Sequence, residues 1–178
     1  MKVYWAKGFA ATSTDDLIHA MGIGRQSLYN AFGDKRQLYL EALDVYTRRT
    51  MAGHLERLNR PDSPLKGIND LLGGLIAKDD KLRAMGCMGV SSVGEFGTSD
   101  RKLAAIRNKA GPILSARLVE RLREGQAKGE IGADIDPNEA AAFIELTMAG
   151  LQLAARGGAK VNDLRQMSRF IIDRLKAR

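Results

Sequence analysis

Apolar residues recur at every third or fourth position along almost the whole chain, and this spacing is the feature that most restricts its fold. Proline stands only at positions 61, 64, 112 and 137, and runs of alternating β-branched residues are absent. A repeat of about 3.6 residues places apolar side chains on one face of a helix, whereas a half-buried strand needs a repeat of two. The sequence therefore predicts an all-α protein.

Capping and stop residues divide the chain into successive helices. The first complete one covers residues 12–21, with Thr12 and Asp15 at the spacing of a capping box. Pro112 is expected to kink a later helix, and the helix after Asp136 should be buried on every side because its apolar residues cover almost the whole circumference. The expected helices begin near Thr12, Arg25, Asp34, Pro64, Cys87, Asp100, Pro137 and Val161.

Two of the short helices, joined by the turn Gly22-Ile23-Gly24, have the geometry of a helix-turn-helix. On the second helix, Leu28 and Phe32 lie four residues apart and are expected to face the core. Arginine can bond to guanine, glutamine or asparagine to adenine, and tyrosine to phosphate. DNA recognition is one interpretation, and a hairpin whose polar face meets water is the other. The side chains left outside are Arg25, Gln26, Tyr29 and Asn30, with Ser27 at the flank.

Net charge alone does not decide between these interpretations. The formal charge is +7, and phosphate binding relies largely on Lys and Arg. Residues 1–60 carry +3 (nine basic against six acidic residues), and residues 61–178 carry +4 (nineteen against fifteen). The basic excess is thus spread over the chain rather than concentrated in the helix-turn-helix.

Other function classes find little support in the residues. No apolar run approaches the roughly 18 residues of a membrane span, so no membrane partner is expected. Cys87 is the single cysteine, which excludes a disulfide within one chain and favours a cytoplasmic location. His19 and His54 lack Cys or His neighbours at ligand spacing, so no metal or cofactor is expected. No nucleophile, base and oxyanion donor occur together, which argues against an enzyme.

One set of residues occurs in order within positions 8–43: the pair Gly8-Phe9, the Thr-rich cap at Thr12 to Thr14, the pair Leu28-Tyr29, and Phe32 and Lys35. With these features, residues 8–43 resemble the DNA-binding region of the tetracycline-repressor (TetR) family of transcription regulators. The segments "GCMGVSS" and "DIDPNEAAAFIELTMAGL" are similar to that family's sixth and eighth helices. Two positions depart from the family pattern: Gly24 replaces a capping Ser, and Gln26 replaces a small residue.

The resemblance implies a helix-turn-helix DNA-binding domain over residues 1–46, with its first helix incomplete at the N-terminus. A long helix would join it to a ligand-binding and dimerisation domain over residues 47–178. The implied function is a repressor that a small molecule releases from a palindromic double-stranded DNA operator. The alternative is a small-molecule-binding helical protein whose helix-turn-helix no longer binds DNA. The implied phosphate contacts are Thr14 and Lys35, and Tyr29 would touch the backbone or a thymine methyl. The residues implied to face bases are Arg25, Gln26, Ser27 and Asn30.

The same resemblance implies an effector site inside the second domain. Flexible apolar side chains mixed with a few polar ones suit such a site, although each of them also suits an ordinary core. A homodimer is expected through the helices near 137–156 and 160–177, whose apolar faces exceed what one bundle buries. Cys87 fits either a buried small residue or a reactive thiol. The expected lining residues are His54, Met85, Met88, Phe96, Arg117, Phe143 and Met148.

Overall fold

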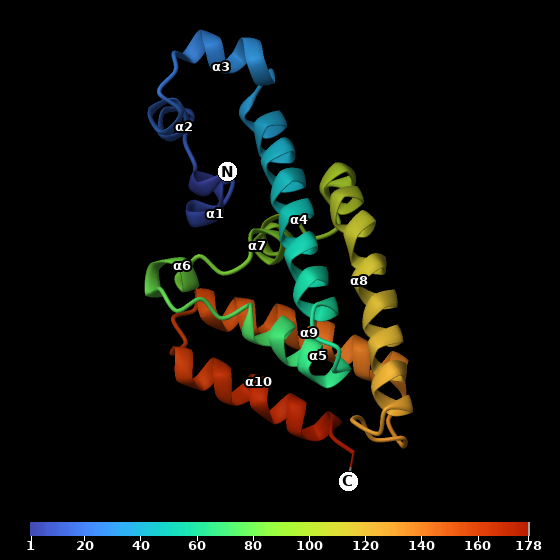
Figure 1. The fold of residues 1–178 in the computed structure, drawn as a ribbon. Coiled ribbons are helices and arrows are strands. Elements are labelled where there is room, and N and C mark those ends of the chain that lie inside the picture. The colour runs from blue at the N-terminus through green and yellow to red at the C-terminus, as the bar shows by residue number, and fades with distance from the viewer. Residues whose placement is uncertain (178) are drawn as a thin grey trace.

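The computed structural model describes residues 1–177, and helices account for most of them (Figure 1). Within this range no extended strand forms, and an isolated antiparallel bridge joins Ile131 to Lys176. The prediction of an all-α protein is confirmed. The helices are α1 (Lys2–Lys7), α2 (Thr14–Met21), α3 (Arg25–Phe32), α4 (Lys35–Asn59), α5 (Pro64–Gly73), α6 (Asp80–Ala84), α7 (Met88–Phe96), α8 (Arg101–Ala127), α9 (Pro137–Arg156) and α10 (Val161–Leu175).

The long helices α4 and α8 run lengthwise through the molecule, whereas α9 and α10 run across them at one end (Figure 1). Helices α2 and α3 occupy one end of the molecule, α10 lies near the other, and α4 runs between the two ends beside α8 (Figure 1). The long connector predicted after Asp34 is therefore present, and the Asp34 side chain caps it by accepting a hydrogen bond from the Gln37 amide. No helix in the described part of the chain is long and apolar enough to cross a bilayer.

Two separate hydrophobic clusters form, and α4 contributes to both. The first lies around Tyr39 and Leu43 and gathers buried side chains from α1 to α4. The second lies around Leu118 and Ile144 and draws on α5, α8, α9 and α10. Met88 of α7 and Leu103 of α8 pack into the first cluster, together with Phe96. Helices α7 and α8 therefore pack directly against the N-terminal helices, although α7 and α8 lie beyond residue 46 in the sequence.

The cap of α2 lies one residue later than the sequence pattern suggested. Ser13 caps this helix, accepting from the Asp16 amide while the Asp16 carboxylate accepts from the Ser13 amide. Thr12 is buried, and its hydroxyl donates to the carbonyl of Gly8 instead. The predicted Thr12–Asp15 box is wrong because burial removed Thr12 from the cap and left Ser13 free to take it.

The prediction that the helix after Asp136 is buried on every side is also wrong. Phe143, Leu146 and Leu153 on α9 are 52%, 73% and 63% exposed. Helix α9 packs against α6, α7, α8 and α10 with one side, and its outer side has no neighbour among residues 1–177. Pro112 lies inside α8, which continues through it from Arg101 to Ala127.

Candidate nucleic-acid interface and effector cavity

Helices α2 and α3 form the helix-turn-helix that the glycine spacing predicted. Gly22 adopts a left-handed conformation (φ 65°, ψ 32°), which lets the chain turn sharply between the helices. Leu28 is fully buried and Phe32 half-buried, so the inner face of α3 is anchored as expected. The outer face of α3 is fully open to solvent at the end of the molecule (Figure 1). Its exposed residues are Arg25, Gln26, Ser27, Tyr29 and Asn30.

The polar side chains of α3 contact one another and α2. The Gln26 Nε2 donates to Asn30 Oδ1 at 2.9 Å, one helical turn away. The Arg25 guanidinium forms an ion pair with Asp15 of α2 at 2.7 Å, and both side chains remain mostly exposed. The amide pair holds Gln26 and Asn30 in a fixed relation, while the exposed ion pair is weak enough to exchange partners.

Lys35 lies where an anion near the start of α2 would meet it. Its Nζ donates to the carbonyl of Thr12 at 2.6 Å and stands 4.3 Å from the centre of the Phe9 ring. Thr14 is the first residue of α2, two positions beyond Thr12. An ammonium group and a helix N-terminus both favour negative charge. The structure thus brings Thr14 and Lys35 to the same edge of the helix-turn-helix.

A set of polar contacts, here called the linking contacts, ties the N-terminal helices to α7, α8 and α9. The Glu95 carboxylate of α7 accepts from the amides of Phe9 and Ala10, with N···O distances of 2.9 and 3.1 Å. Arg36 at the start of α4 pairs with Asp100, the cap of α8. Because these partners lie far apart in sequence, no local pattern indicated them.

Arg156 at the end of α9 supplies a further linking contact. Its guanidinium donates to the carbonyl of Met85 at 2.9 Å and to the carbonyls of Trp5 and Ala6 at 3.3 and 3.4 Å. These last two carbonyls lie at the C-terminal end of α1, where a helix end favours a cation. A movement of α9 or α7 would therefore act on the segment that leads into the helix-turn-helix.

A cavity of about 320 Å³, here called the effector cavity, lies between α4, α7, α8 and α9 and is open to solvent. That volume is at the lower end of the range for small-molecule sites. Two of the expected residues, His54 and Met148, line it. Cys87, at the cap of α7, is also part of the wall. The other lining residues include Thr47, Thr50, Met51, Val90, Val93, Arg107, Leu114, Glu145 and Gln152.

The other expected lining residues lie outside the effector cavity. Met88 and Phe96 pack in the N-terminal cluster, where the Phe96 ring contacts the rings of Phe9 and Tyr39 at centroid distances of 5.5 and 5.8 Å. Phe143 faces outward from α9, and Met85 follows the end of α6. Their positions do not support the expected role, because apolar composition alone cannot separate a cavity wall from a core or an exposed face.

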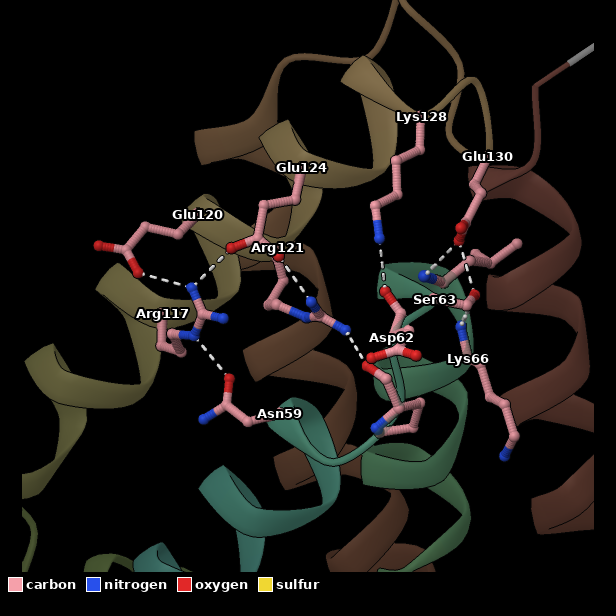
Figure 2. A network of polar contacts seen from close by, with 12 residues as sticks. Asn59, Asp62, Ser63, Lys66, Arg117, Glu120, Arg121, Glu124, Lys128 and Glu130 are labelled. Carbon is pink, nitrogen blue, oxygen red and sulfur yellow. Dashed lines mark hydrogen bonds and ion pairs between the residues drawn. The ribbon is translucent and has the colours of Figure 1, made fainter.

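Arg117 also lies elsewhere, in a polar network between α4, α5 and α8 (Figure 2). Its Nε donates to Asn59 Oδ1 at 2.6 Å, and its Nη1 reaches Glu120 at 2.8 Å and Glu124 at 2.9 Å. The buried Arg121 shares Glu124 and donates to the Pro61 carbonyl. These contacts satisfy the Arg117 guanidinium and fix the loop between α4 and α5, which is a structural role.

Two titratable groups in the effector cavity are shifted toward their neutral forms. Burial, assisted by the Arg57 charge, lowers the pKa of His54 to about 4. Its Nδ1 is buried without a hydrogen-bond partner among the described residues. Burial also raises the pKa of Glu145. At neutral pH the cavity therefore presents an uncharged imidazole.

The chain is similar to known bacterial transcriptional regulators. The family described as "Bacterial regulatory proteins, tetR family" matches residues 1–42. The chain is 31% identical over 166 residues to the uncharacterized HTH-type transcriptional regulator YezE of Bacillus subtilis (strain 168), covering 92% of this chain and 86% of that protein. It is 27% identical to the HTH-type transcriptional repressor ComR of Escherichia coli (strain K12), covering 94% and 81%.

A solved structure is similar over nearly the whole chain. It is a cysteine mutant of the TetR family transcriptional regulator CifR, complexed with 26-base-pair double-strand operator DNA. The match has a TM-score of 0.76 and 26% identity, and it covers 97% of this chain and 91% of the other. The similarity thus extends from the helix-turn-helix through the helices that enclose the effector cavity.

Proposed function

The chain belongs to the TetR family of transcriptional regulators, and on that premise we propose that it is a repressor that a small molecule releases from a palindromic operator. The observation that carries this proposal is the geometry of α3, with Leu28 fully buried and a row of polar side chains exposed on the other face. CifR supports it, since that relative is described in complex with operator DNA. ComR, described as a repressor, supports the direction of regulation.

We assign the DNA contacts by the chemistry of each side chain. Arg25 would bond to guanine, Gln26 and Asn30 to adenine, and Ser27 to either base or backbone. Thr14, Tyr29 and Lys35 would hold phosphates, with Tyr29 also able to contact a thymine methyl. We further propose that residues 1–46 form the DNA-binding domain and that residues 47–178 bind the effector and dimerise.

The outer faces of α9 and α10 support a homodimer. Phe143, Leu146 and Leu153 on α9 and Met167 and Phe170 on α10 are all more than half exposed. Exposed apolar area of this kind is typical of an interface between protein chains. A twofold dimer would present two copies of α3 to half-sites about 34–36 Å apart or a multiple of that spacing.

The effector would act by changing the relation between the two copies of α3. Helices α7 and α9 line the effector cavity and also carry Glu95 and Arg156, which hold the segment leading into α2. A ligand that favours a different position of these helices would favour a state unable to fit both half-sites. The expected coupling between ligand and operator is about 1–3 kcal/mol.

A gel-shift assay with the DNA flanking the chain's own gene tests the proposal. Specific retardation that a cavity ligand reverses is the expected result. A ligand that binds the effector cavity tightly without changing operator affinity would contradict the proposed switch. Absence of specific retardation would instead favour the alternative, a helical ligand-binding protein whose helix-turn-helix does not bind DNA.

A further inference from the structure

A second cavity, of about 270 Å³, lies beside the effector cavity along α4 and is here called the arginine cavity. The two cavities adjoin, because both are lined by Tyr46, Thr50, His54, Leu75 and Gln152. The arginine cavity is further enclosed by α1, α6 and the segment around Gly74. It is therefore adjacent to the effector cavity and contacts the N-terminal helices directly.

The charge of the arginine cavity is of one sign. Arg49, Arg57 and Arg83 line it, and no Asp or Glu side chain within residues 1–177 does so. Field lines from like charges are concentrated in a recess with low-dielectric walls, and such a recess attracts ions of the opposite sign. The lining of the effector cavity is mainly apolar instead, because most of its side chains are aliphatic, aromatic or small.

The hydrogen bonds of these arginines show which of them remain available. Arg83 is occupied, since it donates to the carbonyls of Ala77 and Ala159 and pairs with Asp80. Arg57 makes a hydrogen bond within its own helix, from Nη1 to the Gly53 carbonyl at 3.0 Å, and forms no ion pair with a described carboxylate. Arg49 forms neither a side-chain hydrogen bond nor an ion pair within the described range. Most guanidinium donors of Arg49 and Arg57 are thus free for a ligand.

We propose that the effector is an amphipathic anion, with its apolar body in the effector cavity and its anionic group beside Arg49 and Arg57 in the arginine cavity. This inference rests on the proposed function and names the chemical class of its ligand. Carboxylate and phosphate oxygens share the required chemistry, because both accept charge-assisted hydrogen bonds from guanidinium groups. The neutral imidazole of His54 and the hydroxyl of Thr50 stand at the junction, where the apolar body meets the anionic group.

The arginine cavity lies close to the linking contacts, so a bound anion could affect them. Trp5 of α1 lines this cavity, and its Nε1 donates to the Gly86 carbonyl at 2.9 Å. Gly86 also lines the cavity and immediately precedes Cys87, the cap of α7. An anion in this cavity would therefore share its lining with Trp5 and Gly86, which belong to the junction of α1 and α7.

Isothermal titration calorimetry on the full chain, with probes of closely similar apolar chains, tests the inference. The probes are octanoate, octyl phosphate and octanol, whose alkyl chains differ by at most one methylene group and whose head groups differ. The wild type is expected to bind at least one of the anions about tenfold more tightly than octanol, as one charge-assisted hydrogen bond provides. A preference for octanoate or for octyl phosphate then identifies the anionic group.

Variants locate the anion. Arg49→Ala and Arg57→Gln are each expected to reduce binding of the preferred anion by about tenfold while leaving octanol binding unchanged. Arg49 is exposed, and glutamine keeps part of the Arg57 stem that packs over Gly74, so both variants should fold, which thermal unfolding verifies. Arg48→Ala is the matched control, because Arg48 is the neighbouring residue on α4 and lines neither cavity.

Three results would overturn the inference: equal binding of octanol and both anions, no binding of either anion, or an equal loss in Arg48→Ala. Operator affinity measured without any probe distinguishes failure of the proposed ligand class from failure of the proposed repressor function. Specific DNA binding without anion preference refutes the ligand class and leaves the repressor proposal standing. Anion preference without specific DNA binding refutes the repressor proposal and leaves the ligand site standing.

Discussion

The Arg25 guanidinium has a partner in the free protein and would need another on DNA. Its ion pair with Asp15 is largely solvent-exposed, and such pairs contribute only about 0–1 kcal/mol. A bidentate contact to guanine contributes about 1–3 kcal/mol of discrimination, so exchange of Asp15 for the base is favourable. The ion pair leaves the guanidinium mostly exposed and therefore able to exchange Asp15 for a base.

We therefore expect Arg25→Ala to lower affinity for the operator about tenfold or more while changing non-specific affinity little. Lys35→Ala provides the comparison, because loss of a phosphate contact should weaken binding to all sequences and reduce the salt slope by about one. Fluorescence anisotropy with operator and unrelated duplexes at several salt concentrations measures both. Equal losses for the two variants on every sequence would contradict the assigned roles.

His54 makes stability depend on pH. In the unfolded chain this imidazole takes up a proton near its ordinary pKa of 6.5, whereas burial and Arg57 lower the folded pKa to about 4. Between these values the unfolded state binds more protons, so stability falls as pH falls through this window. Urea unfolding should show a loss of about 1–2 kcal/mol between pH 7 and pH 5 that is absent in His54→Leu. His19→Leu, at an exposed position, should retain the loss, and an unchanged pH profile in His54→Leu would exclude this assignment.

For single residues, the sequence predicted which side chains are exposed better than it predicted their hydrogen-bond partners. The outward face of α3 follows from the period of a helix, so Arg25 and Gln26 were placed correctly on it. The partner of Gln26 was not predicted: its amide donates to Asn30, one turn along the helix. Arg49 and Arg57 were missed, since a cavity wall depends on helix packing rather than on local spacing.

Among the elements, α7 has the most consequential position. Its Glu95 carboxylate accepts backbone hydrogen bonds from two amides of the turn after α1, and a Cβ at Gly8 would collide with Glu95 Oε1. Gly8 also has a positive φ of 82°, which other residues rarely adopt. The backbone conformation therefore favours glycine at position 8, and a side chain there would displace the Glu95 carboxylate from the two amides.

We expect Glu95→Ala to release this turn. Amide hydrogen exchange at Phe9 and Ala10 should become faster, because both amides lose their acceptor. Specific DNA affinity should fall as well, since the helix-turn-helix is then less firmly positioned on α4. Glu41→Ala, which removes an exposed carboxylate from α4, is the matched control. Unchanged exchange at residues 9 and 10 in Glu95→Ala would refute the linking role.

Helix boundaries were predictable where a cap or a glycine stop is unambiguous. Helix α3 was predicted with its observed ends because Gly24 and Gly33 flank it, and Asp136 and Pro137 start α9 as expected. The α2 cap was misplaced because Thr12 and Ser13 both suit a cap, and only burial distinguishes them. The exposure of α9 was missed because periodicity cannot tell a core from an interface.

For the whole molecule, dimerisation is the assumption on which operator recognition depends. We expect Leu146→Glu combined with Leu153→Glu to give a monomer, since a buried interface does not accommodate unpaired carboxylates. Light scattering coupled to size-exclusion chromatography measures the mass. Ala52→Glu, an acidic substitution on the exposed side of α4, should remain dimeric. A dimeric double variant would place the interface elsewhere.

The central claim is that α3 reads a specific operator, and one comparison tests it most directly. Fluorescence anisotropy would measure binding of the wild-type chain to the DNA flanking its own gene and to an unrelated duplex of equal length, at one salt concentration. Specific recognition predicts an affinity for the flanking DNA at least about a thousandfold higher. Equal affinity for the two duplexes would contradict it.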